Sequence, residues 1–308
     1  MHENNNHPAL SISIFVLLGF VWGTGYSIAR FAMTNGVPPL GYSFWQSLGP
    51  AIILSVITLY RNHSLQLTAA NARFYLVCGL TGIVIPNTSM YFAAAHLPAS
   101  ILAMVVNTVP IIAYPMALLA RLEVFNWIRA LGIVLAFCGL MLIILPASSL
   151  PSPDMAPWVL STLVTPVSFA FCSIYIARYR PKDTDTLSLT TGMLIFSSLL
   201  LIPLVLFANS FYVFHFPLTM PDWVILLEIV LSSIGYILFF QLIRLAGPVF
   251  YSLVDTIVVL TGVFWGYMIF GEQLNRWTIT AACLILNALL LVTCQQRKAT
   301  GSVLADNE

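Results

Sequence analysis

Charged side chains are scarce in this sequence. Only 7% of its 308 residues are Asp, Glu, Lys or Arg, whereas 59% are hydrophobic. A soluble chain carries about 25% charged residues, so a soluble fold of this length could not cover its surface. The formal net charge is +1, and the chain therefore lacks the basic face that a nucleic-acid partner requires. We expect a membrane protein whose main surroundings are the lipid bilayer.

Patterns for cofactors, metals and catalysis are also missing. The five cysteines stand singly without CxxC spacing, which predicts neither a disulfide framework nor a zinc site. No Gly-rich phosphate loop precedes a Lys and a Ser or Thr, so ATP is not expected to drive the protein directly. An intramembrane enzyme needs reactive groups within its spans, but no histidine lies deep in a predicted span, and His96 and His215 lie near the outer span ends. We predict no catalytic residue, no metal ligand and no cofactor.

Long apolar runs fill most of the chain. A helix needs about 20 residues to cross the hydrocarbon core, and its backbone groups must be satisfied internally. The runs predict ten helices at residues 10–33, 38–60, 73–94, 99–120, 126–146, 155–178, 186–208, 222–245, 248–271 and 276–294. Turn-forming residues separate them at Asn35–Pro39, Arg61–His63, Pro151–Asp154, Pro181–Asp183 and Gly247–Pro248. No Lys or Arg occurs in the first ten residues, so we expect the first run to stay in place rather than act as a cleaved signal peptide.

The basic residues predict the orientation of these spans, because cytoplasmic loops collect Lys and Arg. With the N-terminus inside, only Arg30 and Arg276 fall outside. The inner side then holds Arg61, Arg73, Arg121, Arg129, Arg178, Arg180, Lys182, Arg244, Arg297 and Lys298. Ten residues against two place both termini in the cytoplasm of a cell with an inner membrane.

The two halves of the chain resemble each other. At a shift of 149 residues, Glu123–Asn126 falls on Glu272–Asn275, and Val105–Thr108 falls on Val254–Ile257. Further matches are Gly132 with Ala281, Gly139 with Ala288 and, at a shift of 148, Ile28–Arg30 with Ile176–Arg178. Because five spans is an odd number, the halves must have opposite orientations. Such an inverted repeat is typical of transporters that alternate access around a shared central site.

Three motifs carry a resemblance to a known family. The first helix contains Phe-Val-Trp-Gly-Thr-Gly-Tyr-Ser-Ile-Ala-Arg at Phe20–Arg30. The fourth contains Asn-Thr-Val-Pro at Asn107–Pro110, ends on Leu122–Glu123 and is followed by a helix with spaced glycines. Phe270–Glu272 repeats the latter motif in the second half. These features resemble the drug/metabolite transporter superfamily of the EamA type.

The resemblance covers residues 11–146 as a first five-helix repeat and 157–294 as a second, and leaves 295–308 as a cytoplasmic tail. It implies an all-α membrane protein of ten helices in two inverted repeats. It also implies export of amino acids or similar small metabolites, often coupled to an ion such as the proton.

Asp255 is the main candidate for coupling and substrate binding. It lies seven residues into the predicted ninth span, where a charge costs about 2.5–3.5 kcal/mol on insertion scales. It should therefore face a wet cavity or a partner, although a structural bond between helices is the alternative. Asn107 is one position from its repeat mate, and both could border one pocket. An interhelical amide bond is the alternative for Asn107.

Glu228, six residues into the predicted eighth span, is a second coupling candidate, with an interfacial carboxylate as the alternative. The predicted cavity walls are Trp22, Tyr26, Tyr91 and Phe240. Glycines beside the first two form a Gly19-x-x-x-Gly23 surface, which favours close helix packing.

Glu123 and Glu272 lie at span ends, on opposite sides of the membrane. We expect them to cap helices or to pair with Arg121, Arg129 or Arg276 rather than to touch a substrate. A broad exporter of drugs or apolar cations is the serious alternative to a metabolite exporter. A passive channel is disfavoured by the inverted repeat.

Overall fold

The computed structural model describes residues 8–61, 65–145, 150, 152–181, 184–251 and 253–305, and these form helices and connecting turns. The first half contains α1 (Pro8–Thr34), α2 (Pro39–Tyr60), α3 (Ala69–Gly79), the π-helical turn η1 (Leu80–Val84), α4 (Ile85–Ala94), α5 (Ala99–Val106), α6 (Val109–Leu119) and α7 (Trp127–Ile144). The second half contains the 3₁₀ turn η2 (Pro153–Met155), α8 (Ala156–Thr162), α9 (Val164–Tyr179), α10 (Thr186–Phe207), α11 (Met220–Tyr251), α12 (Val254–Phe270) and α13 (Arg276–Ala305).

Nine helical stretches of the described chain are long and apolar enough to cross a membrane. They are Leu10–Thr34, Pro39–Tyr60, Ala69–Ala94, Ala99–Leu119, Trp127–Ile144, Pro153–Tyr179, Thr186–Phe207, Met220–Ile243 and Arg276–Thr293. Helix α12 is a tenth apolar helix, of 17 residues. At 1.5 Å per residue it is about 25 Å long, a little less than the hydrocarbon core of about 30 Å. The prediction of an all-α membrane protein with ten spans is confirmed.

The boundary between the eighth and ninth spans was predicted wrongly. The expected turn at Gly247–Pro248 lies inside α11, which continues to Tyr251, and α12 begins only at Val254. A proline removes one backbone hydrogen bond, and helices in a membrane bundle tolerate that loss because neighbouring groups compensate for it. Asp255 is therefore in the first turn of α12 and not seven residues into a helix.

The tenth span agrees with the predicted range 276–294, because its apolar stretch covers Arg276–Thr293. Helix α13 itself continues beyond this stretch to Ala305. Parts of three predicted turns, at residues 62–63, 151 and 182–183, lie outside the described residues.

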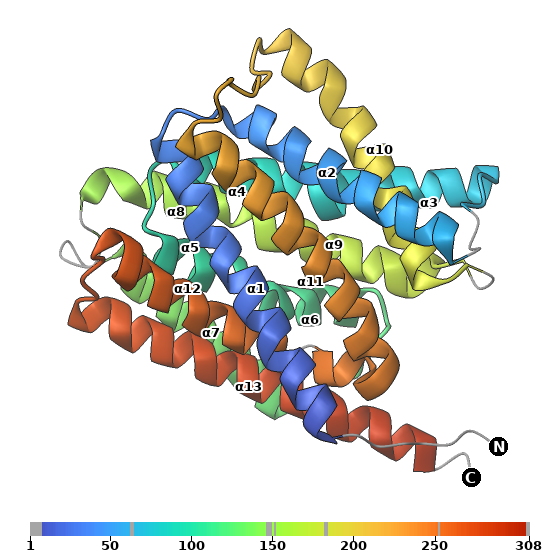
Figure 1. Ribbon diagram of the computed structural model, residues 1–308. Coiled ribbons are helices and arrows are strands. Elements are labelled where there is room, and N and C mark those ends of the chain that lie inside the picture. The colour runs from blue at the N-terminus through green and yellow to red at the C-terminus, as the bar shows by residue number, and fades with distance from the viewer. Residues whose placement is uncertain are drawn as a thin grey trace.

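The two halves pack across each other rather than side by side. Helix α1 packs on α11 and α12, and its counterpart α9 packs on α4 and α6. The pairs α2 with α10, α5 with α12 and α7 with α13 each join counterparts from the two halves. Figure 1 shows α13 running along α7, with the beginning of α1 and the end of α13 at the same end of the bundle. Exchanging the halves maps these pairings onto one another, as an inverted repeat requires.

The contact between α7 and α13 has this symmetry at the level of single residues. A side chain on Gly132 would meet Ala288 O at 3.2 Å, and one on Gly139 would meet Ala281 O at 3.1 Å. Each glycine thus faces the repeat mate of the other. Without a side chain at these positions the two backbones approach closely, which is how membrane helices gain packing energy. The predicted helix contact of these four residues is confirmed.

Helices α7 and α13 have equivalent N-caps. The Asn126 side chain accepts hydrogen bonds from the backbone N–H groups of Ile128 and Arg129, at 2.8 and 3.2 Å. Its repeat mate Asn275 accepts from the Thr278 N–H at 2.9 Å. Such caps satisfy N–H groups that have no partner within the helix. The repeat therefore extends to the local chemistry of the helix starts.

Replacing Gly139 by Leu tests the α7–α13 contact. The new Cβ would meet Ile285 Cγ1 at 2.9 Å and a backbone carbonyl at 3.1 Å, and overpacking of this kind costs about 1–3 kcal/mol. We expect a lower melting temperature in detergent for Gly139→Leu than for the wild type. Cys138→Leu is the control, because Cys138 is the exposed neighbour on the same helix. Equal melting temperatures for the two variants would mean that Gly139 faces lipid.

Candidate functional site

The predicted site residues fall into two adjacent groups. The first joins α1, α5 and α12. The Asn107 amide donates to the Tyr26 hydroxyl at 3.0 Å and to Ala103 O at 2.7 Å, and both side chains are buried. Asp255 interacts electrostatically with the Tyr26 hydroxyl. The structure therefore brings Tyr26, Asn107 and Asp255 together, as the repeat predicts.

Asp255 differs from its neighbours because nothing compensates its charge. It is half-buried, and among the described residues it has no hydrogen-bond or ion-pair partner. A carboxyl group without a partner inside a membrane helix bundle raises the free energy of the folded protein. This favours an exchangeable partner, such as a proton or a ligand, over the structural bond that was the alternative for Asp255.

A break in the fourth span and the start of the ninth span lie beside this group. The fourth span is interrupted at Asn107 and Thr108, between α5 and α6. In the ninth span α12 starts at Val254, the repeat mate of Val105. The starts of α6 and α12 thus both lie near Asn107 and Asp255. Interrupted helices place their polar ends inside the membrane, and transporters use such ends to bind substrates.

The second group surrounds Glu228 on α11. The Ser232 hydroxyl donates to Glu228 Oε1 at 2.9 Å and accepts from Gln46 Nε2 at 3.3 Å. Gln46 Oε1 in turn accepts from Asn87 Nδ2 at 3.0 Å. This chain crosses from α4 through α2 to α11. Glu228 itself is 8% exposed, and its second oxygen, Oε2, is buried without a hydrogen-bond partner.

Tyrosines line this second group and connect it to the first. The Glu228 carboxylate interacts electrostatically with the hydroxyls of Tyr42, Tyr91 and Tyr236. The rings of Tyr42 and Tyr91 meet edge to face, with centroids 4.7 Å apart. Tyr91 also interacts electrostatically with Tyr26. The two groups are therefore neighbours on the two sides of α1.

The remaining predicted wall residues lie at the edge of the second group. Trp22 faces α11, where its indole fills the space beside Gly235 and approaches the Phe239 ring at 6.0 Å. Phe240 packs on a separate apolar cluster between α2 and α10 that includes Leu54. Neither residue is brought to Asp255 by the described contacts.

Gly19 and Gly23 make the close contact between α1 and α12. A side chain on Gly19 would meet Ile257 Cβ at 2.5 Å, and one on Gly23 would meet Val258 O at 2.7 Å. The packing interpretation of this glycine pair is confirmed.

Glu272 closes one end of the bundle, where α1 and α12 end and α5 begins. Its carboxylate accepts from the N–H groups of Ala99 and Ser100 at 2.7 and 3.1 Å, from the Ser100 hydroxyl, and from Arg30. The Arg30 guanidinium also lies over the Phe270 ring at 4.5 Å. We call this the Glu272 clamp. The expected capping role of Glu272 is confirmed, because its carboxylate accepts from the first N–H groups of α5. Its ion pair is with Arg30 rather than with Arg276.

At the opposite end the repeat mates make different contacts. Glu123 pairs with Arg129 at 2.8 Å, one of the three partners that the sequence predicted. Arg178, the mate of Arg30, is exposed and without an ion-pair partner among the described residues. The clamp also needs Gly266, whose missing side chain leaves room for the Glu272 carboxylate, and Ala117 stands at its mate. The two ends therefore carry different interactions.

Comparison with known proteins agrees with this architecture. The family model described as the EamA-like transporter family matches residues 9–145 and 156–294. The chain belongs to this family. No curated protein sequence matches it significantly. A solved structure described only as the crystal structure of a protein is similar to it, with a TM-score of 0.63, 15% identity, and coverage of 94% of this chain and 99% of the other. At that identity the likeness concerns the fold alone.

Family membership confirms several predictions. This EamA-like protein is a multi-pass membrane transporter of small substrates, with two EamA domains that form its repeated halves, and it is not an enzyme.

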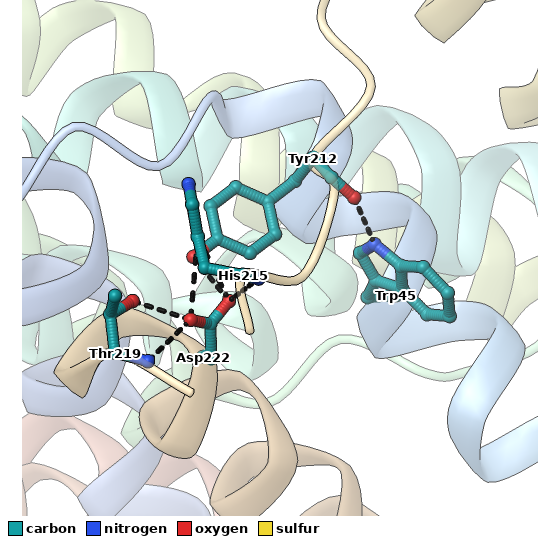
Figure 2. Close-up of polar contacts among 5 residues, drawn as sticks. All are labelled: Trp45, Tyr212, His215, Thr219 and Asp222. Carbon is teal, nitrogen blue, oxygen red and sulfur yellow. Dashed lines mark hydrogen bonds and ion pairs between the residues drawn. The ribbon is translucent and has the colours of Figure 1, made fainter. Parts of the chain in front are cut away.

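The loop between α10 and α11 is bound to the first turn of α11 and to α2. Figure 2 shows Asp222 accepting from the Tyr212 hydroxyl at 2.8 Å and from Thr219 N at 2.7 Å, with His215 beside it. The Trp45 indole on α2 donates to Tyr212 O at 2.8 Å. Burial and the hydrogen bond to Asp222 raise the pKa of Tyr212 to about 12. The phenol therefore stays protonated near neutral pH and keeps the loop tied to α11.

A pocket of about 470 Å³ lies at the clamp. Arg30, Ser100 and Glu272 line it, together with Asn275 and Thr278. It is a polar recess at the end of the bundle, and neither carboxyl group of the two central groups borders it.

Sequence reasoning did not single out Tyr42, Tyr236, Gln46 or Asn87 as site residues. A signal was present, because Glu228, Ser232 and Tyr236 follow one another at intervals of four and so share a face of one helix. Tyr42 and Gln46 have the same spacing on α2.

Proposed function

We propose that this EamA-like transporter exports amino acids or similar small metabolites by alternating access, with the substrate held between the two halves beside Asn107, Asp255 and Glu228. The observation that supports this most is the break in the fourth span, which lies beside the start of the ninth span and next to a carboxyl group without a partner among the described residues. Because the fourth and ninth spans are counterparts in an inverted repeat, one set of residues can be exposed to either side as the halves rock.

The chemistry of the two groups fits a substrate with an amino group. Two carboxyl groups, Asp255 and Glu228, lie in the interior without a basic partner among the described residues. The start of α6 presents the positive end of a helix dipole beside Asn107, which favours a carboxylate. A zwitterion would satisfy both. An apolar cation would use the carboxyl groups alone, and this remains the second candidate.

The Glu272 clamp is proposed as the gate at one end. Its ion pair and hydrogen bonds join α1, α5 and α12, so that end opens only when they break. By the distribution of Lys and Arg this end is external, both termini are cytoplasmic, and the membrane is the inner one.

The Asp255→Asn variant tests the role of the central carboxyl. The amide is nearly isosteric and Asp255 has no partner to lose among the described residues, so folding should survive. Uptake of labelled amino acids into proteoliposomes, driven by a pH gradient, should fall roughly tenfold or more, a loss that about 1.4 kcal/mol produces. Asp154→Asn, in an exposed turn, is the control and should match the wild type. Wild-type rates for Asp255→Asn between roughly pH 6 and roughly pH 8 would make Asp255 structural.

A topology reporter tests the proposed orientation. A reporter enzyme that is active only outside the cytoplasm, fused after Glu308, should give no signal, because ten of the twelve basic residues then lie inside. The same reporter inserted after Gly36, in the turn between α1 and α2, should be active. The opposite pattern would reverse the assignment and make the Glu272 clamp an internal gate.

A further inference from the structure

The surroundings of Glu228 define a site that differs from the Asp255 group. Four residues from three spans form it: Glu228 and Tyr236 of α11, Tyr42 of α2 and Tyr91 of α4. We call this the Glu228 site. It lies on the side of α1 opposite to α12.

The hydrogen bonds at this site fix one half of the carboxylate and leave the other free. In the chain from Asn87 through Gln46 and Ser232, every donor points toward Glu228, and the chain ends on Oε1. Oε2 is buried and receives nothing. The Tyr42 hydroxyl is also buried without a hydrogen-bond partner. Buried polar atoms without a partner are costly, so Glu228 Oε2 is available to accept a hydrogen bond from a bound group.

The residue opposite Glu228 is a glycine, which has no side chain. Gly25 of α1 faces the carboxylate, and a Cβ there would lie 3.4 Å from Oε1 and 3.7 Å from Oε2. Space beside the carboxylate thus depends on how closely α1 approaches α11. A small movement of α1 would admit a compact group next to Oε2.

The aromatic rings complete the chemistry. Faces of tyrosine attract cations through the ring quadrupole, and aromatic cages combined with a carboxylate are suited to ammonium groups. Three phenols lie within the field of Glu228, and no Lys, Arg or His pairs with it among the described residues. A positively charged group that donates hydrogen bonds and comes from outside the chain would complement this site.

We propose that the Glu228 site binds the cationic nitrogen of the transported molecule, with Oε2 as its counter-ion and Tyr42, Tyr91 and Tyr236 around it. The substrates are then amines and amino acids with a free ammonium group, whereas analogues that lack the nitrogen are excluded. This rests on the proposed function and adds the part of the substrate that the protein recognises.

Four phenyl compounds that differ in charge test the proposal. Phenethylamine is a cation, phenylalanine a zwitterion, 2-phenylethanol neutral and 3-phenylpropionate an anion. Inhibition of counterflow in proteoliposomes by each compound gives its apparent affinity. For the wild type we expect the two compounds with an ammonium group to bind more tightly than the other two by roughly tenfold or more, the ratio that about 1.4 kcal/mol produces.

Glu228→Gln keeps an acceptor for Ser232 but removes the charge. It should bind phenethylamine and 2-phenylethanol equally, whereas Asp154→Asn should keep the wild-type ratio. Glu228→Asp retains the charge and should keep the preference for the amine at lower affinity, which separates loss of charge from loss of folding. If Glu228→Gln does not fold, the test uses Glu228→Asp and Tyr42→Phe instead. Tyr42→Phe should lower the ratio of the affinities for phenethylamine and 2-phenylethanol only partly.

The outcomes separate this proposal from the proposed function. A wild-type preference for the amine that persists in Glu228→Gln would overturn the Glu228 site while leaving transport intact. A Glu228→Asp variant that folds but has lost the preference for the amine would overturn it as well. If the wild type carries none of the labelled amino acids or amines, the proposed function itself fails, and this inference fails with it.

Discussion

An odd number of spans in each half constrains the whole molecule, because the second half must then enter the membrane in the opposite direction from the first. The helices respond by pairing across the halves, with α7 against α13, α2 against α10 and α5 against α12. At the α7–α13 contact each glycine meets the backbone of its partner's repeat mate. The interior between the halves is where the polar residues gather, and it belongs to neither half alone.

Within this arrangement the two ends of the bundle differ in their contacts. The Glu272 clamp uses two backbone N–H groups at the start of α5, the Arg30 side chain and the space left by Gly266. At the other end the repeat mates of Ala99 and Ser100 are Pro248 and Val249, of which the first has no N–H to donate. A clamp of the same kind cannot form there. The conformation described is therefore the one in which the clamp end is closed.

Hydropathy, charge and internal similarity were enough to predict the all-helical fold, the ten spans and the glycine contact between α7 and α13. The end of α11 was missed because Gly247 and Pro248 signal a turn in water but not within a bundle, where neighbouring groups compensate a lost hydrogen bond. The partner of Glu272 was missed because Arg30 is 242 residues away in sequence.

The site was predicted in part. Asn107 and Asp255 could be placed together through the repeat. The division of the candidate site into two groups, however, depends on which face of α1 each side chain occupies. Tyr26 and Gly25 are adjacent in sequence, yet one contacts Asn107 and the other faces Glu228. A rotation of 100° per residue separates neighbours on a helix, and only packing determines what each one meets.

The central claim is that the clamp end and the opposite end open in alternation. Spin labels at exposed positions test it directly in a chain whose five cysteines are replaced: Thr34→Cys with Gln273→Cys at the clamp end, and Tyr179→Cys with Val124→Cys at the other. Distances would be measured by double electron–electron resonance in lipid, with and without Glu272→Gln. The account predicts that breaking the clamp lengthens the first distance and shortens the second. Unchanged distances, or both lengthening together, would contradict it.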